Sequence, residues 1–150
     1  MTADDYYEIQ NLINLYFQRV DAGDFEGCGT LFKKAVVHYP SSGMKIYKDP
    51  AAIAELMRSY VKLYGDAQTP LTRHHSGNII LEPTGIGTAK AQCSAIIFQG
   101  TPDLPFQAIG EASYSDIFAK IDGLWTFTYR EINLNFMGDM SHHLSREVKS

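Results

Sequence analysis

The segment DDYYEIQNLINLYFQRVDAGDF, residues 4–25, places its apolar residues at the spacing of one helix face. Thr2, followed three residues later by Asp5, resembles a capping box, which satisfies free backbone N–H groups at a helix start. Gly23 is typical of a helix end because glycine tolerates a left-handed backbone. We therefore predict a helix over residues 4–20, whose buried face is made by Ile9, Leu12, Ile13, Tyr16, Phe17 and Val20.

The next part of the chain predicts two more helices and two short strands. Asp24, and Asp49 followed by Pro50, are typical of helix starts, because Asp caps free N–H groups and proline fits the first turn. The expected elements are a short helix over 25–32, strands over 35–39 and 44–47 around a turn, and an amphipathic helix that begins at residue 50 and stops near Gly65.

From Leu71 onward, long runs separated by turn residues predict an antiparallel meander. A parallel sheet would need helices between its strands, and here the helices come first. The order therefore predicts an α+β fold, with the N-terminal helices packed on one face of a curved sheet. The expected strands are residues 72–82, 88–98, 107–120 and 125–136.

Length and composition restrict the class of protein. With 150 residues, 45% of them hydrophobic and 20% charged, the chain is expected to form one soluble, cytoplasmic domain. The net charge of −4 and the lack of a basic run argue against a nucleic-acid partner, and no apolar run is long enough for a membrane span. Cys28 and Cys93 favour two buried thiols, although a disulfide stays open. Nine Tyr and eight Phe fit either a ligand cavity or an oligomer interface.

Asp21 is an unusual residue because it continues the apolar stripe of the first helix, four residues after Phe17. A carboxylate against apolar surroundings is costly unless it has a cationic or hydrogen-bonding partner. The pattern therefore predicts a buried partner for Asp21. The simpler alternative is that Asp21 only ends the helix and hydrogen-bonds the turn at residues 22–23.

The segment TRHHSGN, residues 72–78, contains a candidate general base. Strand alternation sends His74, Ser76 and Asn78 to one face of the sheet. If that face is the one covered by helices, His74 is suited to proton transfer, because imidazole titrates near neutral pH. The alternative is a surface strand with satisfied polar side chains. His75 points to the opposite face, so a metal ion bound by both histidines is not expected.

Three features together resemble the SnoaL-like branch of the nuclear transport factor 2-like superfamily. They are the helix end Val-Asp-Ala-Gly-Asp-Phe at residues 20–25, the strand pattern Thr-Arg-His-x-x-x-Asn at residues 72–78, and Trp125 at the start of the last strand. The resemblance spans residues 4–136. It implies a cone-shaped α+β barrel, in which a mostly antiparallel sheet wraps around the first helix and leaves a deep cavity.

Within this superfamily the pattern is similar to scytalone dehydratase, which implies roles for individual residues. His74 is expected to abstract a proton, Asp21 to hold the imidazole tautomer, and Asn78 or a tyrosine to donate to the developing oxyanion or leaving group. The expected function is a dehydratase-like lyase or an isomerase, without cofactor or metal, that acts on a small hydrophobic cyclic molecule. The expected substrate-binding residues are Tyr39, Tyr60, Tyr114 and Phe17.

Two other functions stay open at this point. One is a non-catalytic domain that binds a small hydrophobic molecule, with a structural Asp-His pair. The other is an assembly domain like the β subunits of ring-hydroxylating dioxygenases. The resemblance also implies a homo-oligomer, a dimer or trimer formed through the outer sheet surface. We expect a single domain over residues 1–136, followed by a tail, residues 137–150, that acts as a lid or stays mobile.

Overall fold

The computed structural model describes residues 1–146 of the chain. This part contains three helices and six strands. The four long strands extend slightly beyond their predicted ends. In chain order the elements are α1 (Ala3–Asp21), α2 (Phe25–Leu31), β1 (Val36–Tyr39), β2 (Met44–Tyr47), α3 (Pro50–Tyr60), β3 (Thr72–Gly85), β4 (Thr88–Thr101), β5 (Leu104–Ile121) and β6 (Leu124–Met137).

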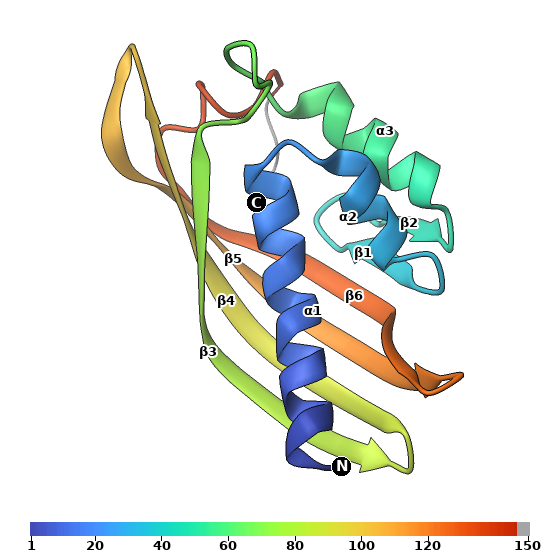
Figure 1. Ribbon diagram of the computed structural model, residues 1–150. Coiled ribbons are helices and arrows are strands. Elements are labelled where there is room, and N and C mark those ends of the chain that lie inside the picture. The colour runs from blue at the N-terminus through green and yellow to red at the C-terminus, as the bar shows by residue number, and fades with distance from the viewer. Residues whose placement is uncertain (147–150) are drawn as a thin grey trace.

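The strands form one curved, open sheet in the order β2-β1-β6-β5-β4-β3. Neighbouring strands are antiparallel except β1 and β6, which are parallel. Helix α1 lies across the concave face, and α2 and α3 pack together beside it (Figure 1). The predicted α+β fold class is thus confirmed. Within residues 1–146, no helix is both long and apolar enough to cross a membrane.

The helix starts follow the predicted caps. Thr2 and Asp5 form both hydrogen bonds of a capping box at the start of α1. The carboxylates of Asp24 and Asp49 accept backbone N–H groups three residues further along, at 2.9 and 3.0 Å. Pro50 occupies the first turn of α3, where its missing N–H costs nothing. Local side-chain chemistry therefore sets where each helix begins.

Helix α3 ends at Tyr60, so the predicted end near Gly65 is wrong. Val61 already has an extended backbone and forms a β-bridge with Leu144. The backbone N–H of Ser145 donates to the carbonyl of Tyr60 at 2.8 Å. The C-terminal part of the chain therefore hydrogen-bonds the backbone groups of residues 60 and 61, which a longer helix would have paired within itself.

The N-terminal end of α1 is fastened to the sheet through Asp5. One carboxylate oxygen, Oδ1, accepts hydrogen bonds from the Lys120 ammonium and from the Trp125 indole, both at 2.7 Å. The other oxygen, Oδ2, accepts the backbone N–H of Thr2 at 2.7 Å. Asp5, which belongs to the capping box, thus also holds the start of α1 on β5 and β6.

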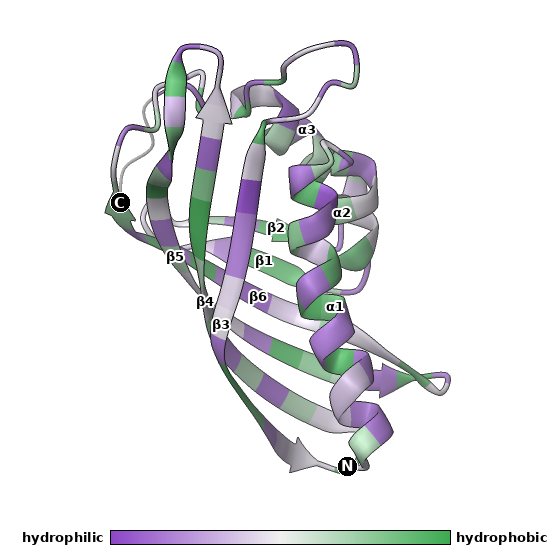
Figure 2. Ribbon diagram, turned by 60° about the vertical axis from the view of Figure 1, so that its left-hand side comes forward, coloured by the Kyte–Doolittle hydropathy of each residue, from purple (hydrophilic) through white to green (hydrophobic). Residues whose placement is uncertain are grey.

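Side chains alternate between the two faces of the sheet. In Figure 2 this alternation is seen as hydrophobic residues that follow hydrophilic ones along the strands. On the concave face, the strands bury small residues such as Ala91, Ala95 and Ala112. Cys28 and Cys93 are buried free thiols, and burial raises their pKa to about 12 and about 11. They are therefore protonated core residues. The outer face exposes Ile80, Ile96, Ile117 and other apolar side chains, and the homo-oligomer stays a prediction.

A bulge in β3 interrupts this alternation at Asn78. The register of β3 on β4 shifts between Gly77 and Ile80, and Asn78 has a left-handed backbone with φ of 51°. The extra residue leaves the Asn78 side chain exposed. The expectation that Asn78 shares a face with His74 is therefore wrong, because strict alternation holds only in a strand without a bulge.

A buried ion pair lies between β5 and β6. Arg130 is fully buried and donates two hydrogen bonds of 2.7 Å to Asp116. Its guanidinium carbon also lies 4.6 Å from the ring centre of Tyr16 and 4.9 Å from that of Tyr114. Burial alone would lower the pKa of Arg130, but the Asp116 carboxylate raises it, so the charge is retained. Arg130 therefore belongs to the core.

Removing one partner of this ion pair should strongly destabilise the fold. Asp116→Ala leaves the Arg130 charge buried without a counter-charge, so we expect the free energy of unfolding to fall by about 3–5 kcal/mol. Urea denaturation followed by Trp125 fluorescence measures the change. Lys90→Ala is a matched control, since the Lys90–Glu82 pair between strands is more than half exposed and is worth at most about 1 kcal/mol. Equal losses in both variants would contradict a special role for the buried pair.

Asp5 should make stability depend on pH in the acid range. Hydrogen bonds from the Lys120 ammonium, the Thr2 backbone and the Trp125 indole hold the pKa of Asp5 well below its ordinary value of 3.8. A carboxylate with a depressed pKa stabilises the fold above its unfolded pKa and loses that contribution as the pH falls. Asp5→Asn should therefore lose less stability than the wild type between about pH 5 and about pH 2. Thermal melting across this range tests it, and parallel curves would refute it.

Candidate active site

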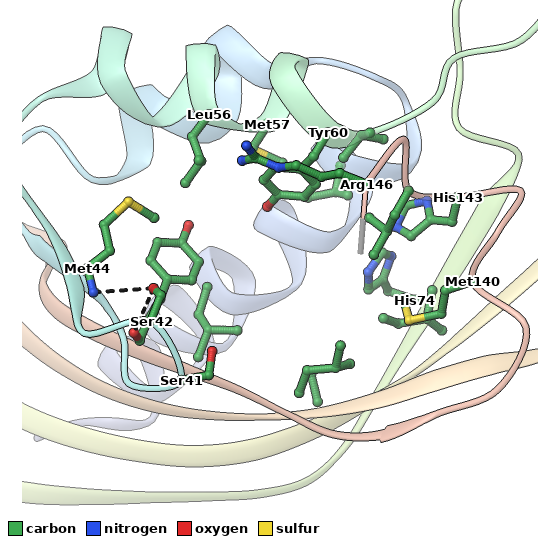
Figure 3. Close-up of a pocket in the computed structure, with 18 of the residues that line it drawn as sticks. Ser41, Ser42, Met44, Leu56, Met57, Tyr60, His74, Met140, His143 and Arg146 are labelled. Atoms are coloured by element: carbon green, nitrogen blue, oxygen red, sulfur yellow. Dashed lines mark hydrogen bonds between the residues drawn. The ribbon is translucent and has the colours of Figure 1, made fainter. Parts of the chain in front are cut away.

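A cavity of about 700 Å³ opens between the concave sheet face, the C-terminal half of α1, α3 and the C-terminal chain (Figure 3). Its volume lies within the range of small-molecule sites. Most of its lining is apolar, for example Val20, Met57, Ile97 and Leu134. The cavity is therefore suited to a small, largely hydrophobic molecule.

Asp21, the last residue of α1, accepts three hydrogen bonds from β3. Its Oδ1 accepts the Thr72 hydroxyl at 2.8 Å and lies 2.6 Å from Nδ1 of His74, and its Oδ2 accepts the backbone N–H of His74 at 2.8 Å. Burial alone would raise the pKa of Asp21, but the hydrogen bond and charge of His74, with the other two donors, lower it. Asp21 is therefore an ionised carboxylate, and its partner is on β3 instead of in the turn at residues 22–23.

The imidazole of His74 is held in one orientation. Its side chain is only 6% exposed and stacks on the Phe17 ring, with centroids 5.6 Å apart. An ionised carboxylate only accepts hydrogen bonds, so Nδ1 of His74 donates to Asp21. The neutral ring then carries its lone pair on Nε2. Because His74 lines the cavity and Nδ1 faces Asp21, this basic nitrogen is the one available to a bound molecule.

Three of the tyrosines singled out from the sequence line the cavity, namely Tyr39, Tyr60 and Tyr114. Burial raises the pKa of Tyr60 to about 12 and raises those of Tyr39 and Tyr114 as well, so all three phenols stay protonated at neutral pH. Within residues 1–146, no hydrogen bond to another protein group engages these three hydroxyls. They are therefore potential donors to a bound molecule.

Two expected site residues lie elsewhere. Phe17 is buried beneath His74 and is not part of the cavity wall, because the imidazole covers it. Phe17 supports the base instead of touching the ligand. Asn78 is exposed at the bulge of β3 and is also not part of the wall. Neither is therefore positioned to contact a molecule in the cavity.

Sequence reasoning missed His143, which lies in the tail segment, defined here as residues 138–146. His143 is 5% exposed and lines the cavity together with His74. Burial, and next the charge of His74, lower the pKa of His143 to about 4, with Asp21 acting in the opposite direction. The sequence around His143 has no periodic pattern, so nothing in it signalled burial. Residues 147–150 of the predicted tail lie outside the described residues.

The site offers little for a metal ion. Within residues 1–146, no group of three or more His, Cys, Asp or Glu residues is arranged to hold one. Its chemistry therefore comes from ionised Asp21, the imidazoles of His74 and His143, and phenol groups. Such a set can accept a proton and donate hydrogen bonds in a desolvated space.

Comparisons with known proteins agree with this architecture. Residues 1–131 match the SnoaL-like domain family. A Novosphingobium aromaticivorans protein named after scytalone dehydratase superposes with a TM-score of 0.72, at 19% identity over 98% of this chain and 91% of that one. An NTF2-like protein with a cystatin-like fold from the same organism gives a TM-score of 0.69, at 24% identity over 87% and 82% of the two chains.

A third solved structure, ActVI-ORFA from Streptomyces coelicolor, gives a TM-score of 0.71, at 17% identity over 89% of this chain and 98% of that one. No match was found among curated protein sequences. At these identities the solved structures show only a shared fold. The family match covers residues 1–131, most of the chain, and therefore shows the family. The chain belongs to the SnoaL-like domain family.

Proposed function

We propose that this protein is a cofactor-independent lyase or isomerase that removes a proton from a small, largely apolar cyclic molecule. The observation that carries the proposal is the contact of 2.6 Å between His74 Nδ1 and Asp21 Oδ1 at the cavity wall. A base oriented by a carboxylate is a recurring arrangement for proton transfer. The arrangement lies in a cavity of suitable size instead of on the surface.

In the proposed reaction, Nε2 of His74 takes a proton from a carbon atom of the substrate. The ring becomes an imidazolium, whose positive charge is stabilised by the ionised Asp21. The second bond to Asp21, from the backbone N–H of His74, keeps the carboxylate and the imidazole in one relative position. Asp21 thus orients the base and stabilises the product of the transfer.

The electron pair released from the carbon either moves onto a substrate oxygen or expels a leaving group on the neighbouring atom. In both cases negative charge develops away from the base. The cavity wall holds hydrogen-bond donors that can stabilise this charge. Tyr39, Tyr60 and Tyr114 supply protonated phenols to the wall. Donors of this kind act strongly when water is excluded, because the local dielectric is low.

Binding without turnover is the other function that this cavity supports. Its mostly apolar wall suits a hydrophobic metabolite, and the Asp21–His74 contact then serves only to join α1 to β3. The two functions differ in what happens to a bound carbon acid. A catalytic His74 accelerates proton removal, and a structural one leaves its rate unchanged.

Nitrobenzisoxazole is a suitable probe, because a base that removes its ring C–H proton breaks the N–O bond and releases a coloured nitrophenolate. We expect the protein to accelerate this elimination. His74→Ala should lower the rate constant roughly 100- to 10,000-fold, the usual contribution of a positioned general base. Asp21→Asn should lower it by about tenfold or more, since the imidazole loses the carboxylate that orients it.

His75→Ala is the matched control for the His74 variant. His75 is the next residue on β3, is exposed on the opposite face and contacts Phe98, so its removal should leave the rate unchanged. Thermal melting of each variant shows that it is folded. Equal rates in the wild type and His74→Ala, or a wild-type rate no higher than that of the buffer, would favour binding without turnover.

A further inference from the structure

His143 is a buried polar side chain that the proposed reaction leaves without a role. It is 5% exposed, lines the cavity that contains His74, and lies on the tail segment (Figure 3). Figure 3 shows the imidazoles of His74 and His143 at the same end of this cavity. The two imidazoles therefore face the same part of the cavity from different elements, β3 and the tail segment.

The backbone on both sides of His143 is fastened to the rest of the fold. The carbonyl of His143 accepts the backbone N–H of Lys62 at 2.8 Å. The preceding carbonyl, of His142, accepts from the Gln99 amide at 3.1 Å and from the Tyr64 hydroxyl. The imidazole of His143 is thus positioned by main-chain bonds, and its own nitrogens are not needed to hold it.

The ring of His143 has unused hydrogen-bonding capacity. Its Nδ1 is buried and has no hydrogen-bond partner within residues 1–146. Protein atoms enclose this nitrogen, as they do Nδ1 of His142, which lies outside the cavity wall. The ring nitrogen open to a bound molecule is therefore Nε2, which has no hydrogen-bond partner within residues 1–146. The pKa of His143 is lowered to about 4, so the ring is neutral at physiological pH and carries one N–H donor. A neutral imidazole donor suits an oxygen atom that gains negative charge.

We propose that His143 donates a hydrogen bond to the substrate oxygen on which negative charge develops while His74 removes the proton. This inference rests on the function proposed above, and it narrows the substrate to cyclic molecules with a carbonyl group conjugated to the acidic C–H, whose oxygen becomes an enolate or phenolate. The C–H bond breaks, its proton goes to Nε2 of His74, and the electron pair moves to the oxygen. His143 keeps its own proton and only shares it in the hydrogen bond.

Two other groups of candidates, apart from the tyrosines discussed above, are less well placed. Asn78, which the sequence suggested, is exposed outside the cavity. Figure 3 shows Ser41, Ser42 and Met44 at the end of the cavity remote from His74 and His143. An oxygen bound beside the base is therefore nearer to His143 than to the hydroxyl groups of Ser41 and Ser42.

Binding of para-nitrophenol tests the donor without depending on catalysis, because this ligand is a neutral phenol at about pH 5 and a phenolate at about pH 9. His143→Leu removes the donor and keeps an apolar side chain. We expect the phenolate to bind roughly 10- to 100-fold more weakly to this variant than to the wild type, since hydrogen bonds to charged groups are strong. Affinity for the neutral phenol should change much less. Calorimetric titration at both pH values measures the two affinities.

Two further variants separate a donor from a structural role. His143→Gln retains an N–H donor at a similar reach and should keep most of the phenolate affinity. His142→Leu makes the same change at the adjacent histidine, which is not part of the cavity wall, and should leave both affinities unchanged. The inference is overturned if His143→Leu binds phenolate like the wild type, or if His143→Gln binds it as weakly as His143→Leu.

Failure of this inference is distinguishable from failure of the proposed function. If His74→Ala eliminates nitrobenzisoxazole as fast as the wild type while His143→Leu loses phenolate affinity, the base assignment fails and the oxyanion site stands. If His74→Ala is slow and His143→Leu keeps both its phenolate affinity and its elimination rate, the base stands and the His143 role fails.

Discussion

The Asp21 carboxylate joins the main helix to the edge strand, and much of the remaining structure depends on this contact. Its two oxygens accept the Thr72 hydroxyl and both the backbone and ring N–H groups of His74. The backbone N–H of His74 lies on the free edge of β3, where no neighbouring strand can accept it. One carboxylate therefore satisfies an edge group, fixes the end of α1 on the sheet, and selects the tautomer of the imidazole.

Much of the fold was predictable because its signals are local. The capping box at Thr2 and Asp5, the cap at Asp49 and the turn residues between the long strands each act over a few residues. The parallel pairing of β1 with β6 was not predicted, because local patterns do not identify which distant strand becomes a neighbour. The end of α3 was missed for the same reason, since Val61 is extended by its bridge to Leu144, far along the chain.

The site was predictable only in part, and the reasons differ from residue to residue. Asp21 stood out because it is a carboxylate on an apolar helix face. Alternation could not decide whether His74 faced inward, and the family resemblance joined it to Asp21. Asn78 was misplaced because an inserted residue leaves no mark in the sequence pattern. His143 was overlooked because its burial arises from contacts with Lys62 and other residues distant in sequence.

The bulge at Asn78 also bears on how the chain avoids self-association during folding and at high concentration. β3 spans 14 residues at the free edge of the sheet. A flat edge of that length offers an unbroken row of backbone donors and acceptors on which an extended chain can align and begin aggregation. The left-handed residue at φ of 51° and the register shift beside it divide this row into two shorter runs. The irregularity that excludes Asn78 from the cavity thus protects the edge against strand addition by another copy.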